Sequence, residues 1–568
     1  MRNNNRPILI ALLIFIILTF LLSVGFSNIS VYGEALQKLP LVYRKDDDES
    51  TKTPEKTPPI PQVEPSPSET PRPTLTAPIP QIEPDSTPQR SPALTPAPTP
   101  SPYMTRKPEL SPDEARARKR NREILKKRIG NLVRNEPAWK TSKVGICVAV
   151  LDTRDVVYSK NGNLPMIPAS NLKILTTAAA IAQLGPGFKF ETSVWGEPAD
   201  KLTGVMEGNL YLRGTGDPTF MTPFTKDPMA VFRKAVQDLK KKGIRMINGD
   251  LVGDDSAFDR EFLGRGWKPR YLLDDYAAPA GALSINANYI DVGIRNGKVI
   301  MYPDNGHMNV SRKKSKSGRT YIIRKLGTDN VYIYGYKGGR VGRGLTVNNP
   351  SKLTTSAFGR LLKKNGIKIT GKVRLIRNDE KDYTSNRVKL FSHHSVPLYK
   401  IVRETNKESD NVCAQHLFKA IGYYVKGKGT CNNSNEAVRE FLEEAGVNAS
   451  GLIMADGSGL SEYSRVTPVQ FCQLLAYMYK HPQKKPFFKS LPVAGKDGTL
   501  AYRMRGLPVY AKTGSLKGHI ALSGYVRTNA GQMLVFSIMT NYHRYSSGRI
   551  RYNEDQLVKI IASFGGKL

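Results

Sequence analysis

Alternating hydrophobic and polar positions indicate strands at both ends of the region that follows residue 140. Two Val- and Ile-rich runs, at 144–151 and 156–159, flank a short polar segment, and this pattern predicts a β-hairpin. Near the C-terminus, three more strand-like runs cover 509–513, 519–527 and 533–541. We therefore expect one sheet that is assembled from strands of both ends.

Apolar residues at helical spacing predict several helices in the same region. The predicted helices are 170–184, 398–407, 412–425, 435–445 and 553–564. Between the first and the second of these, residues 190–390 show short strands and turns with few helical periods. The predicted fold class is α/β (α+β), a sheet flanked by helices and interrupted by a large β-rich insertion.

The N-terminus has the pattern of a membrane segment. Arg2 and Arg6 precede an uncharged run at 8–26 that is mostly Leu, Ile and Phe, about long enough to span a bilayer at ~1.5 Å per residue. The two arginines place the N-terminus inside and the rest of the chain outside. A cleaved signal peptide within 1–30, cut near residues 31–33, is the alternative. Because the run is longer than a usual signal core, we favour a retained anchor in the cytoplasmic membrane.

A proline-rich section separates this segment from the folded part. Residues 51–112 hold about half of the 39 prolines of the chain, and a seven-residue phrase at 59–65 returns almost unchanged at 78–84. This composition cannot build a core, so we expect a disordered linker over 31–112 that acts as an extended spacer. A docking motif for a proline-binding domain is the alternative, but spacers are far commoner.

The net charge of +36 results from 85 Lys and Arg against 49 Asp and Glu. Basic clusters lie at 116–128 and 312–316. Nucleic acid is the usual partner of such charge, but the predicted extracytoplasmic location and the lack of a nucleic-acid fold signature argue against it. Anionic wall polymers or lipid headgroups fit better, and a solvated surface without a partner stays open.

The cysteines and histidines add no chemistry. Four cysteines are too few and too scattered for a disulfide scaffold. Cys147 and Cys472 lie in apolar runs and are expected to be buried, whereas Cys413 and Cys431 could pair or stay free. No Cys and His cluster has metal-site spacing, so we expect neither metal nor cofactor.

A serine and a lysine stand three residues apart at the start of the predicted helix 170–184. Residues i and i+3 share a helix face, so the Lys173 amine can reach the Ser170 hydroxyl. A hydroxyl beside a positioned base is what nucleophilic catalysis requires. This spacing alone is weak evidence, because it occurs by chance in many helices.

Two later segments make the evidence specific. A Ser-Asp-Asn tripeptide at 409–411 falls between two predicted helices, and Lys-Thr-Gly at 512–514 ends a predicted strand. The patterns S-x-x-K, S-x-N and K-T-G, in this order, form the motif set of penicillin-recognising serine acyl-transferases. Together, each on its expected element, they predict a penicillin-reactive site.

Each residue of the set suits one step of amide cleavage. Ser170 attacks the carbonyl to give an acyl-enzyme, with Lys173 as its base if burial and nearby cations lower the lysine pKa. Lys512 is the expected neighbouring cation. Ser409 offers a hydroxyl that relays a proton to the leaving amine, and Asn411 presents a donor and an acceptor to a peptide amide or to Lys173.

The segment that begins at Lys512 is expected to hold the substrate. Lys512 is the natural anchor for a substrate carboxylate, and Thr513 adds a hydroxyl contact to the same group. Backbone N–H groups of Ser170 and Ser515 are the candidate donors to the oxyanion. Gly514, between Thr513 and Ser515, completes the expected substrate-binding residues. His416 and His519 lie near the motifs, and we interpret both as structural.

The chain resembles low-molecular-mass class C penicillin-binding proteins, the D-alanyl-D-alanine carboxypeptidase/endopeptidase family, over roughly residues 130 to 560. The long gap between Ser170 and Ser409 is similar to that of the family, whereas serine β-lactamases have a much shorter gap. Further phrases that resemble the family are 214–219, 253–258, 276–279, 282–286 and 456–461.

The resemblance implies a transpeptidase-like domain formed by 113–189 and 391–568, with β-rich insertion domains at 190–390. It also implies peptidoglycan stem peptides as the substrate, cut after the penultimate D-alanine or at a crosslink, and β-lactam antibiotics as covalent inhibitors. Asp255 matches an insertion-domain aspartate that approaches the substrate side chain in the family. An aspartate that satisfies a turn is the competing interpretation.

We therefore expect a penicillin-sensitive serine D-alanyl-D-alanine carboxypeptidase/endopeptidase that faces the cell wall. Its intact motifs favour this function over a non-catalytic wall-binding scaffold. A β-lactamase is the weaker alternative, because no convincing E-x-x-L-N deacylation motif is present. Carboxypeptidase and endopeptidase action both stay open, since each breaks a bond that follows a D-alanine.

Overall fold

The computed structural model describes residues 110–338 and 341–568. The predicted N-terminal membrane segment and nearly all of the predicted linker lie outside these ranges. Within the described ranges, no helix combines the length and the apolar character that crossing a bilayer requires. The first described helix is α3 (Pro112–Asn135), which is followed by the short α4 (Pro137–Lys140).

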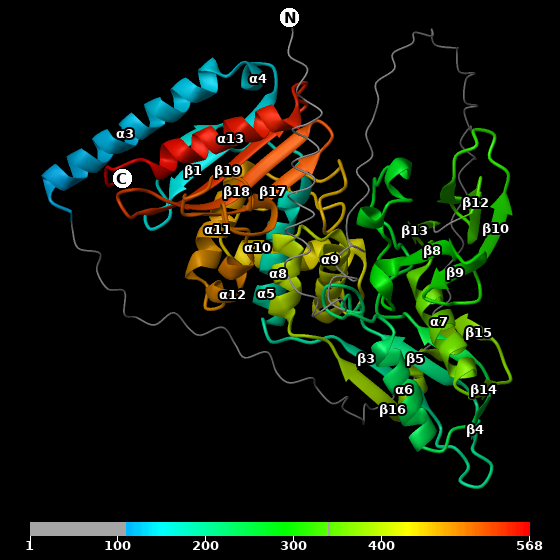
Figure 1. The fold of residues 1–568 in the computed structure, drawn as a ribbon. Helices are drawn as coiled ribbons and strands as arrows, with labels where there is room; N and C mark the ends of the chain where they lie inside the picture. Colours follow the sequence, from blue (N-terminus) through cyan, green and yellow to red (C-terminus); the bar gives the residue numbers. More distant parts are fainter. Residues whose placement is uncertain (1–109, 339–340) are drawn as a thin grey trace, which may run out of the picture. The chain divides into compact units, whose positions relative to one another are not determined.

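The central sheet joins strands from both ends of the folded region, as the sequence predicts (Figure 1). Its order is β17-β18-β19-β1-β2, and every neighbouring pair is antiparallel. β1 and β19 pair along their whole lengths because both are continuous apolar runs buried on both faces. The five strands are β1 (Lys143–Val150), β2 (Val156–Lys160), β17 (Val509–Leu516), β18 (His519–Arg527) and β19 (Met533–Asn541).

Helices cover both faces of this sheet (Figure 1). On one face, α3 and α13 (Ser547–Ala562) share a core with the strands. On the other face, α11 (Pro468–Lys480) packs against β1 and β19 in a second, larger core. The other helices of that layer are α5 (Lys173–Leu184), α8 (Leu398–Lys407), α9 (Asn411–Lys426), α10 (Cys431–Glu444) and α12 (Lys484–Ser490).

A separate hydrophobic core is built from residues 194–391, the section between α5 and α8. It contains a five-stranded sheet of order β15-β7-β5-β3-β16 and three three-stranded sheets, β14-β6-β4, β13-β8-β9 and β10-β12-β11. The strands are β3 (Glu191–Gly196), β4 (Val205–Glu207), β5 (Leu210–Gly214), β6 (Met246–Asn248), β7 (Leu251–Asp254), β8 (Tyr289–Arg295), β9 (Lys298–Tyr302), β10 (Asn309–Lys313), β11 (Tyr321–Arg324), β12 (Asn330–Tyr334), β13 (Val341–Thr346), β14 (Lys368–Ile369), β15 (Val373–Leu375) and β16 (Val388–His394).

Several described helices go beyond the sequence prediction, α4 and α12 among them, and three others show why they were missed. α6 (Ala230–Lys241) and α7 (Pro350–Lys364) lie in the section where few helical periods are evident. The first has a narrow apolar stripe among lysines, and the second contains Ser, Thr and Gly, which have modest helix propensity. The third is α11, which begins at a reciprocal cap between Thr467 and Gln470. The last helix, α13, begins at Ser547, six residues before the predicted start.

All four cysteines are free thiols. Cys147 and Cys472 are buried, as predicted, in the layer between β1 and α11. Cys413 is buried on α9, whereas Cys431 at the start of α10 is only partly buried. The pairing of Cys413 with Cys431 that the sequence left open is therefore absent from this structure.

Candidate active site

Ser170 lies on a short 3-10 turn, Ala169–Leu172, directly before α5. The sequence places it in the first turn of the helix, but the α-helix itself begins at Lys173. Ala169 adopts a φ of 47°, in the left-handed region that residues other than glycine rarely occupy. A Cβ added to Gly459 would lie 1.9 Å from the carbonyl oxygen of Ala169. The strained backbone next to Ser170 is therefore packed closely against this glycine.

The Lys173 amine is the centre of the motif cluster. Its Nζ lies 3.1 Å from Ser170 Oγ and donates to Asn411 Oδ1 at 2.6 Å. A third contact, at 2.8 Å, goes to the carbonyl oxygen of Ser458. The Lys173 side chain is fully buried. The prediction that the Lys173 amine reaches the Ser170 hydroxyl is thus confirmed.

The third motif supplies a second buried amine. Lys512 on β17 donates from Nζ to Ser409 Oγ at 2.9 Å and to the carbonyl oxygen of Thr513 at 2.8 Å. Ser409 stands just before α9 with a φ of 62°, and Asp410 caps that helix by accepting from the N–H of Cys413. The tight turn between α8 and α9 thus presents the Ser409 hydroxyl to Lys512 and the Asn411 side chain to Lys173.

Burial lowers the pKa of both lysines. For Lys173, burial lowers the pKa to about 8, and the carboxylates of Asp456 and Asp410 limit this fall. For Lys512, burial and then the charge of Lys173 lower the pKa well below its ordinary value, with Glu408 opposing. The sequence analysis expects burial together with a neighbouring cation, Lys512, to lower the Lys173 pKa, and burial is the main cause for both amines.

A loop outside the three motifs supports Lys173. Asp456 is buried and accepts from Ser458 Oγ at 2.6 Å, from Leu460 N at 3.0 Å and from Trp267 Nε1 at 2.9 Å. These bonds fix the turn whose Ser458 carbonyl accepts from the lysine. The phrase 456–461 resembles the family, and its glycines indicate a turn. Its aspartate, followed by small turn-forming residues, is the signal that could have indicated a loop built around a buried carboxylate.

The inserted section also reaches the cluster. Asn411 Nδ2 donates to the carbonyl oxygen of Tyr276 at 2.8 Å, on the 3-10 turn Asp275–Ala277. Asn411 is therefore held at both ends, its oxygen by Lys173 and its nitrogen by the insertion. The Tyr276 side chain is 42% exposed, so it stands at the rim of the cluster. The sequence does not reveal this contact, because every residue type has a backbone carbonyl.

The strand β17 passes directly beside the turn that carries the nucleophile. A Cβ on Gly514 would lie 2.7 Å from the carbonyl oxygen of Pro168 and 3.1 Å from the nitrogen of Ser170, so only glycine permits this approach. Thr513 Oγ1 donates to Thr499 Oγ1 at 2.7 Å, and Ser515 Oγ accepts from Arg551 at 3.3 Å. The backbones of the two expected oxyanion donors thus belong to segments in direct contact.

Asp255, the remaining predicted residue, is engaged elsewhere. Its buried carboxylate accepts from Arg260 Nη2 at 2.9 Å and from Arg260 Nε at 3.1 Å. In the part of the chain that the structure describes, no hydrogen bond joins it to the motif residues. A contact between Asp255 and substrate stays a prediction, and the ion pair with Arg260 gives this aspartate a structural role.

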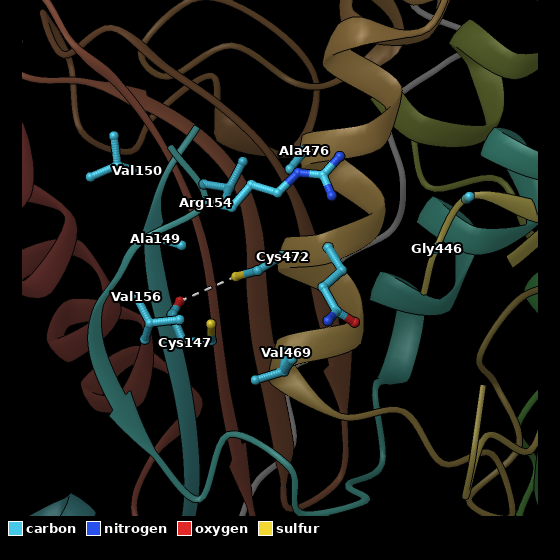
Figure 2. A pocket seen from close by; sticks show the side chains of 12 residues that line it. Cys147, Ala149, Val150, Arg154, Val156, Gly446, Val469, Cys472 and Ala476 are labelled. Carbon is cyan, nitrogen blue, oxygen red and sulfur yellow. Dashed lines mark hydrogen bonds between the residues drawn. The ribbon is translucent and has the colours of Figure 1, made fainter. Parts of the chain in front are cut away.

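A cavity of about 140 Å³ between β1 and α11 is separate from the motif cluster (Figure 2). Cys147, Val469 and Cys472 are among its lining residues, and Cys472 Sγ lies 3.4 Å from the Cys147 carbonyl oxygen. β1 stands two strands away from β18 and three from β17, which carries Lys512. Burial raises the pKa of the Cys472 thiol well above its ordinary value, so this thiol is not a nucleophile at neutral pH.

The histidines near the motifs are buried. Among the described residues, no three His, Cys, Asp or Glu side chains gather at a spacing that could hold a metal ion. His416 is buried with its Nδ1 2.8 Å from the Val412 carbonyl oxygen, and burial lowers its pKa to about 4. The buried His519 stacks edge-on against Tyr542. The cluster therefore offers hydroxyl, amine and amide groups for acyl transfer.

Known proteins are similar to this chain in sequence. The chain is 33% identical over 437 residues to a D-alanyl-D-alanine carboxypeptidase of Actinomadura sp., covering 72% of this chain and 79% of that protein. It is 30% identical over 431 residues to the D-alanyl-D-alanine carboxypeptidase DacB of Haemophilus influenzae, covering 72% and 86%.

Solved structures are similar as well. The crystal structure of penicillin binding protein 4 from Haemophilus influenzae has a TM-score of 0.65 at 26% identity and covers 76% of this chain and 98% of that chain. A structure of the same protein complexed with a β-lactam has a TM-score of 0.62, covering 77% and 99%. The sequence model of the D-Ala-D-Ala carboxypeptidase 3 (S13) family matches residues 125–563, which include all three motifs. The chain therefore belongs to the D-Ala-D-Ala carboxypeptidase 3 (S13) family of serine peptidases.

Proposed function

We propose that this enzyme hydrolyses the D-alanyl-D-alanine ends and crosslinks of peptidoglycan stem peptides through an acyl-enzyme on Ser170. The observation that carries the proposal is the fully buried Lys173 amine, 3.1 Å from Ser170 Oγ, with a pKa of about 8. At pH 7 about a tenth of such an amine is neutral, so a base is available without histidine. The family membership supports the same reaction.

The first half-reaction forms the ester. Neutral Lys173 takes the proton of the Ser170 hydroxyl as Oγ attacks the carbonyl carbon of the penultimate D-alanine. The negative charge that develops on the carbonyl oxygen is stabilised by the backbone N–H groups of Ser170 and Ser515. The amide bond then breaks, and the leaving amine receives a proton from the Ser409 hydroxyl, which is reprotonated by way of the lysines. Water cleaves the ester in the second half-reaction and restores Ser170.

Lys512 and Thr513 are proposed to recognise the terminal carboxylate of the substrate. In this structure Lys512 contacts a hydroxyl and a carbonyl, and its pKa is well below the ordinary value. A substrate carboxylate beside it would favour the charged ammonium. That charge would in turn favour the neutral form of Lys173, so binding of the substrate would help to activate the base.

We place the reaction outside the cytoplasm, where peptidoglycan lies. The uncharged run at 8–26 supports retention in the cytoplasmic membrane, and the proline-rich linker up to residue 112 would carry the enzyme away from it. We further propose that residues 113–189 and 391–568 form the catalytic domain and that 190–390 is its insertion. A β-lactam, with its strained amide and carboxylate, would acylate Ser170 in place of the peptide.

Digestion of purified muropeptides tests this function directly. With the full-length chain, monomeric pentapeptides should lose one D-alanine and crosslinked dimers should yield monomers, both identified by mass, whereas the Ser170→Ala variant should leave both unchanged. Release from monomers only would restrict the enzyme to carboxypeptidase action. If the folded wild-type chain cut neither substrate, the proposed function would be wrong.

The rate of acylation should depend on pH through Lys173. Because the neutral amine is the base and its pKa is about 8, kcat/KM should rise with pH and level off above about pH 8. The Asp410→Asn variant keeps a helix cap but removes one charge that raises the Lys173 pKa. In this variant we expect kcat/KM to rise at a lower pH than in the wild type, and acylation at pH 7 to be roughly twofold faster. Asp238→Asn, an equal charge change on α6, is the control, and identical profiles for all three would contradict this account.

Substrate selection should depend on Lys512. The wild-type enzyme should prefer a peptide that ends in a free D-alanine carboxylate over the same peptide with a C-terminal amide. In Lys512→Ala this preference, measured as the ratio of the two kcat/KM values, should fall by about tenfold or more, because a charge-assisted hydrogen bond is lost. An unchanged ratio would remove Lys512 from carboxylate recognition.

A further inference from the structure

Part of the insertion carries a strong positive charge that its own carboxylates do not offset. Between residues 295 and 345 there are twelve Lys and Arg but two Asp. Both aspartates are paired with cations of α7, Asp304 with Arg360 and Lys364, and Asp329 with Lys352. The local field is therefore positive, and such a field attracts anionic partners.

The sheet β10-β12-β11 presents tyrosines on the same face as this charge. Tyr334 of β12 lies between Lys313 of β10 and Tyr321 of β11, and Tyr332 is two residues away along β12. Because side chains alternate across a sheet, these four point to one face. The intervening residues of β12 are buried on the opposite face, in the core of the insertion. One face of this small sheet thus packs against the core, and the tyrosines lie on the opposite face.

Three tyrosine rings pack against one another on this face, two of them stacked and the third tilted by 54°. The rings of Tyr321 and Tyr334 stack with centroids 4.7 Å apart and planes 12° apart, and the ring of Tyr332 lies 6.2 Å from that of Tyr334. Lys313 Nζ is 5.8 Å from the centre of the Tyr332 ring. Tyr321 is 44% exposed. We call these four residues, with Lys314, Lys316 and Arg319 of the following turn, the tyrosine face.

The cations of the tyrosine face are available to a partner. Among the described residues, no carboxylate forms an ion pair with Lys313, Lys314, Lys316 or Arg319, although 26 ion pairs are present elsewhere. Lys313, Lys314 and Arg319 are exposed on the surface. Folding therefore leaves these charges unneutralised, beside aromatic rings that are held in a fixed arrangement.

Short contacts connect this part of the insertion to the active-site rim. Arg343 of β13 lies 3.7 Å from Asp274, and Arg324 of β11 donates to the Leu272 carbonyl oxygen at 3.5 Å. Asp274 directly precedes the 3-10 turn of Tyr276, whose carbonyl binds Asn411. A polymer held on the tyrosine face would thus be held by the structural unit that also borders the catalytic cluster.

We propose that the tyrosine face binds the glycan strand of peptidoglycan, the polymer that carries the stem peptides. This inference rests on the proposed function and adds a second contact with the same substrate. Pyranose rings expose C–H faces that pack on flat phenol rings, and the carboxylates of the strand and its peptides would pair with the surrounding lysines. A membrane surface fits less well, because Ile323 is the one aliphatic side chain that the described strands of this sheet place on the face, beside Tyr332.

Cosedimentation with insoluble peptidoglycan tests this inference. The full-length chain is used with Ser170→Ala, so that the polymer is not cut, and the peptidoglycan is stripped of attached phosphate polymers. The combined variant Lys313→Glu, Lys314→Glu and Lys316→Glu should bind about tenfold more weakly, and added salt should weaken wild-type binding. Tyr321→Ala, which changes no charge, should also bind more weakly, by about threefold.

The control variant Lys119→Glu, Arg120→Glu and Lys127→Glu makes an equal charge change on α3 and should bind like wild type. Equal weakening in both charge variants, or unchanged binding in Tyr321→Ala, would overturn the inference, as would binding that requires the attached phosphate polymers. The same surface variants are also made with Ser170 intact. Their rates of labelling by fluorescent penicillin and of hydrolysis of a short soluble D-alanyl-D-alanine peptide should stay within about twofold of wild type. Absence of labelling in every variant would instead count against the proposed catalytic function.

Discussion

The burial of two lysine amines in one hydrogen-bonded cluster is the constraint on which the rest of the site depends. An isolated ammonium is costly to bury, so each amine must either find partners or lose its proton. Lys173 has three oxygen acceptors and two nearby carboxylates, which keep its pKa at about 8. Lys512, beside a hydroxyl and a carbonyl, has its pKa lowered much further. The result is one amine with a pKa near neutrality, which can act as a base, and a second amine that can bind an anion. Acyl transfer from a carboxylate-bearing peptide to a serine would use both.

This constraint explains why the cluster draws on distant parts of the chain. The turn before α5 carries Ser170, the junction of α8 and α9 carries Ser409 and Asn411, and β17 carries Lys512. The sheet β17-β18-β19-β1-β2 joins the two ends of the folded region, so the turn of Ser170 and the strand of Lys512 meet although more than 300 residues separate these two residues. Glycine at 514 allows the strand to approach the nucleophile's turn. The section between α5 and α8 adds the Tyr276 carbonyl, which accepts from Asn411, and the Trp267 side chain, which donates to Asp456.

The sequence was enough to predict a helix after the first motif, a helix junction at the second and a strand at the third. It ended that strand at residue 513, however, whereas β17 continues to Leu516 and contains the whole third motif. Lys173 in reach of Ser170 followed from helix geometry alone. The 3-10 turn at Ser170 did not follow, because it depends on packing against Gly459. The contacts of Lys173 with Ser458 and of Asn411 with Tyr276 were equally hidden, since backbone carbonyls make them. Burial was correctly expected to lower the lysine pKa, but its extent relative to the neighbouring charges becomes known only in the folded chain.

The central claim is that Ser170 is the residue that becomes acylated. The most direct measurement is the mass of the full-length chain after incubation with penicillin, followed by proteolysis and location of the modified peptide. The account predicts one penicillin per chain, attached to the peptide that contains Ser170, and none on the Ser170→Ala variant. An adduct on another residue, such as Ser409, or an unmodified wild-type chain that is correctly folded, would contradict it.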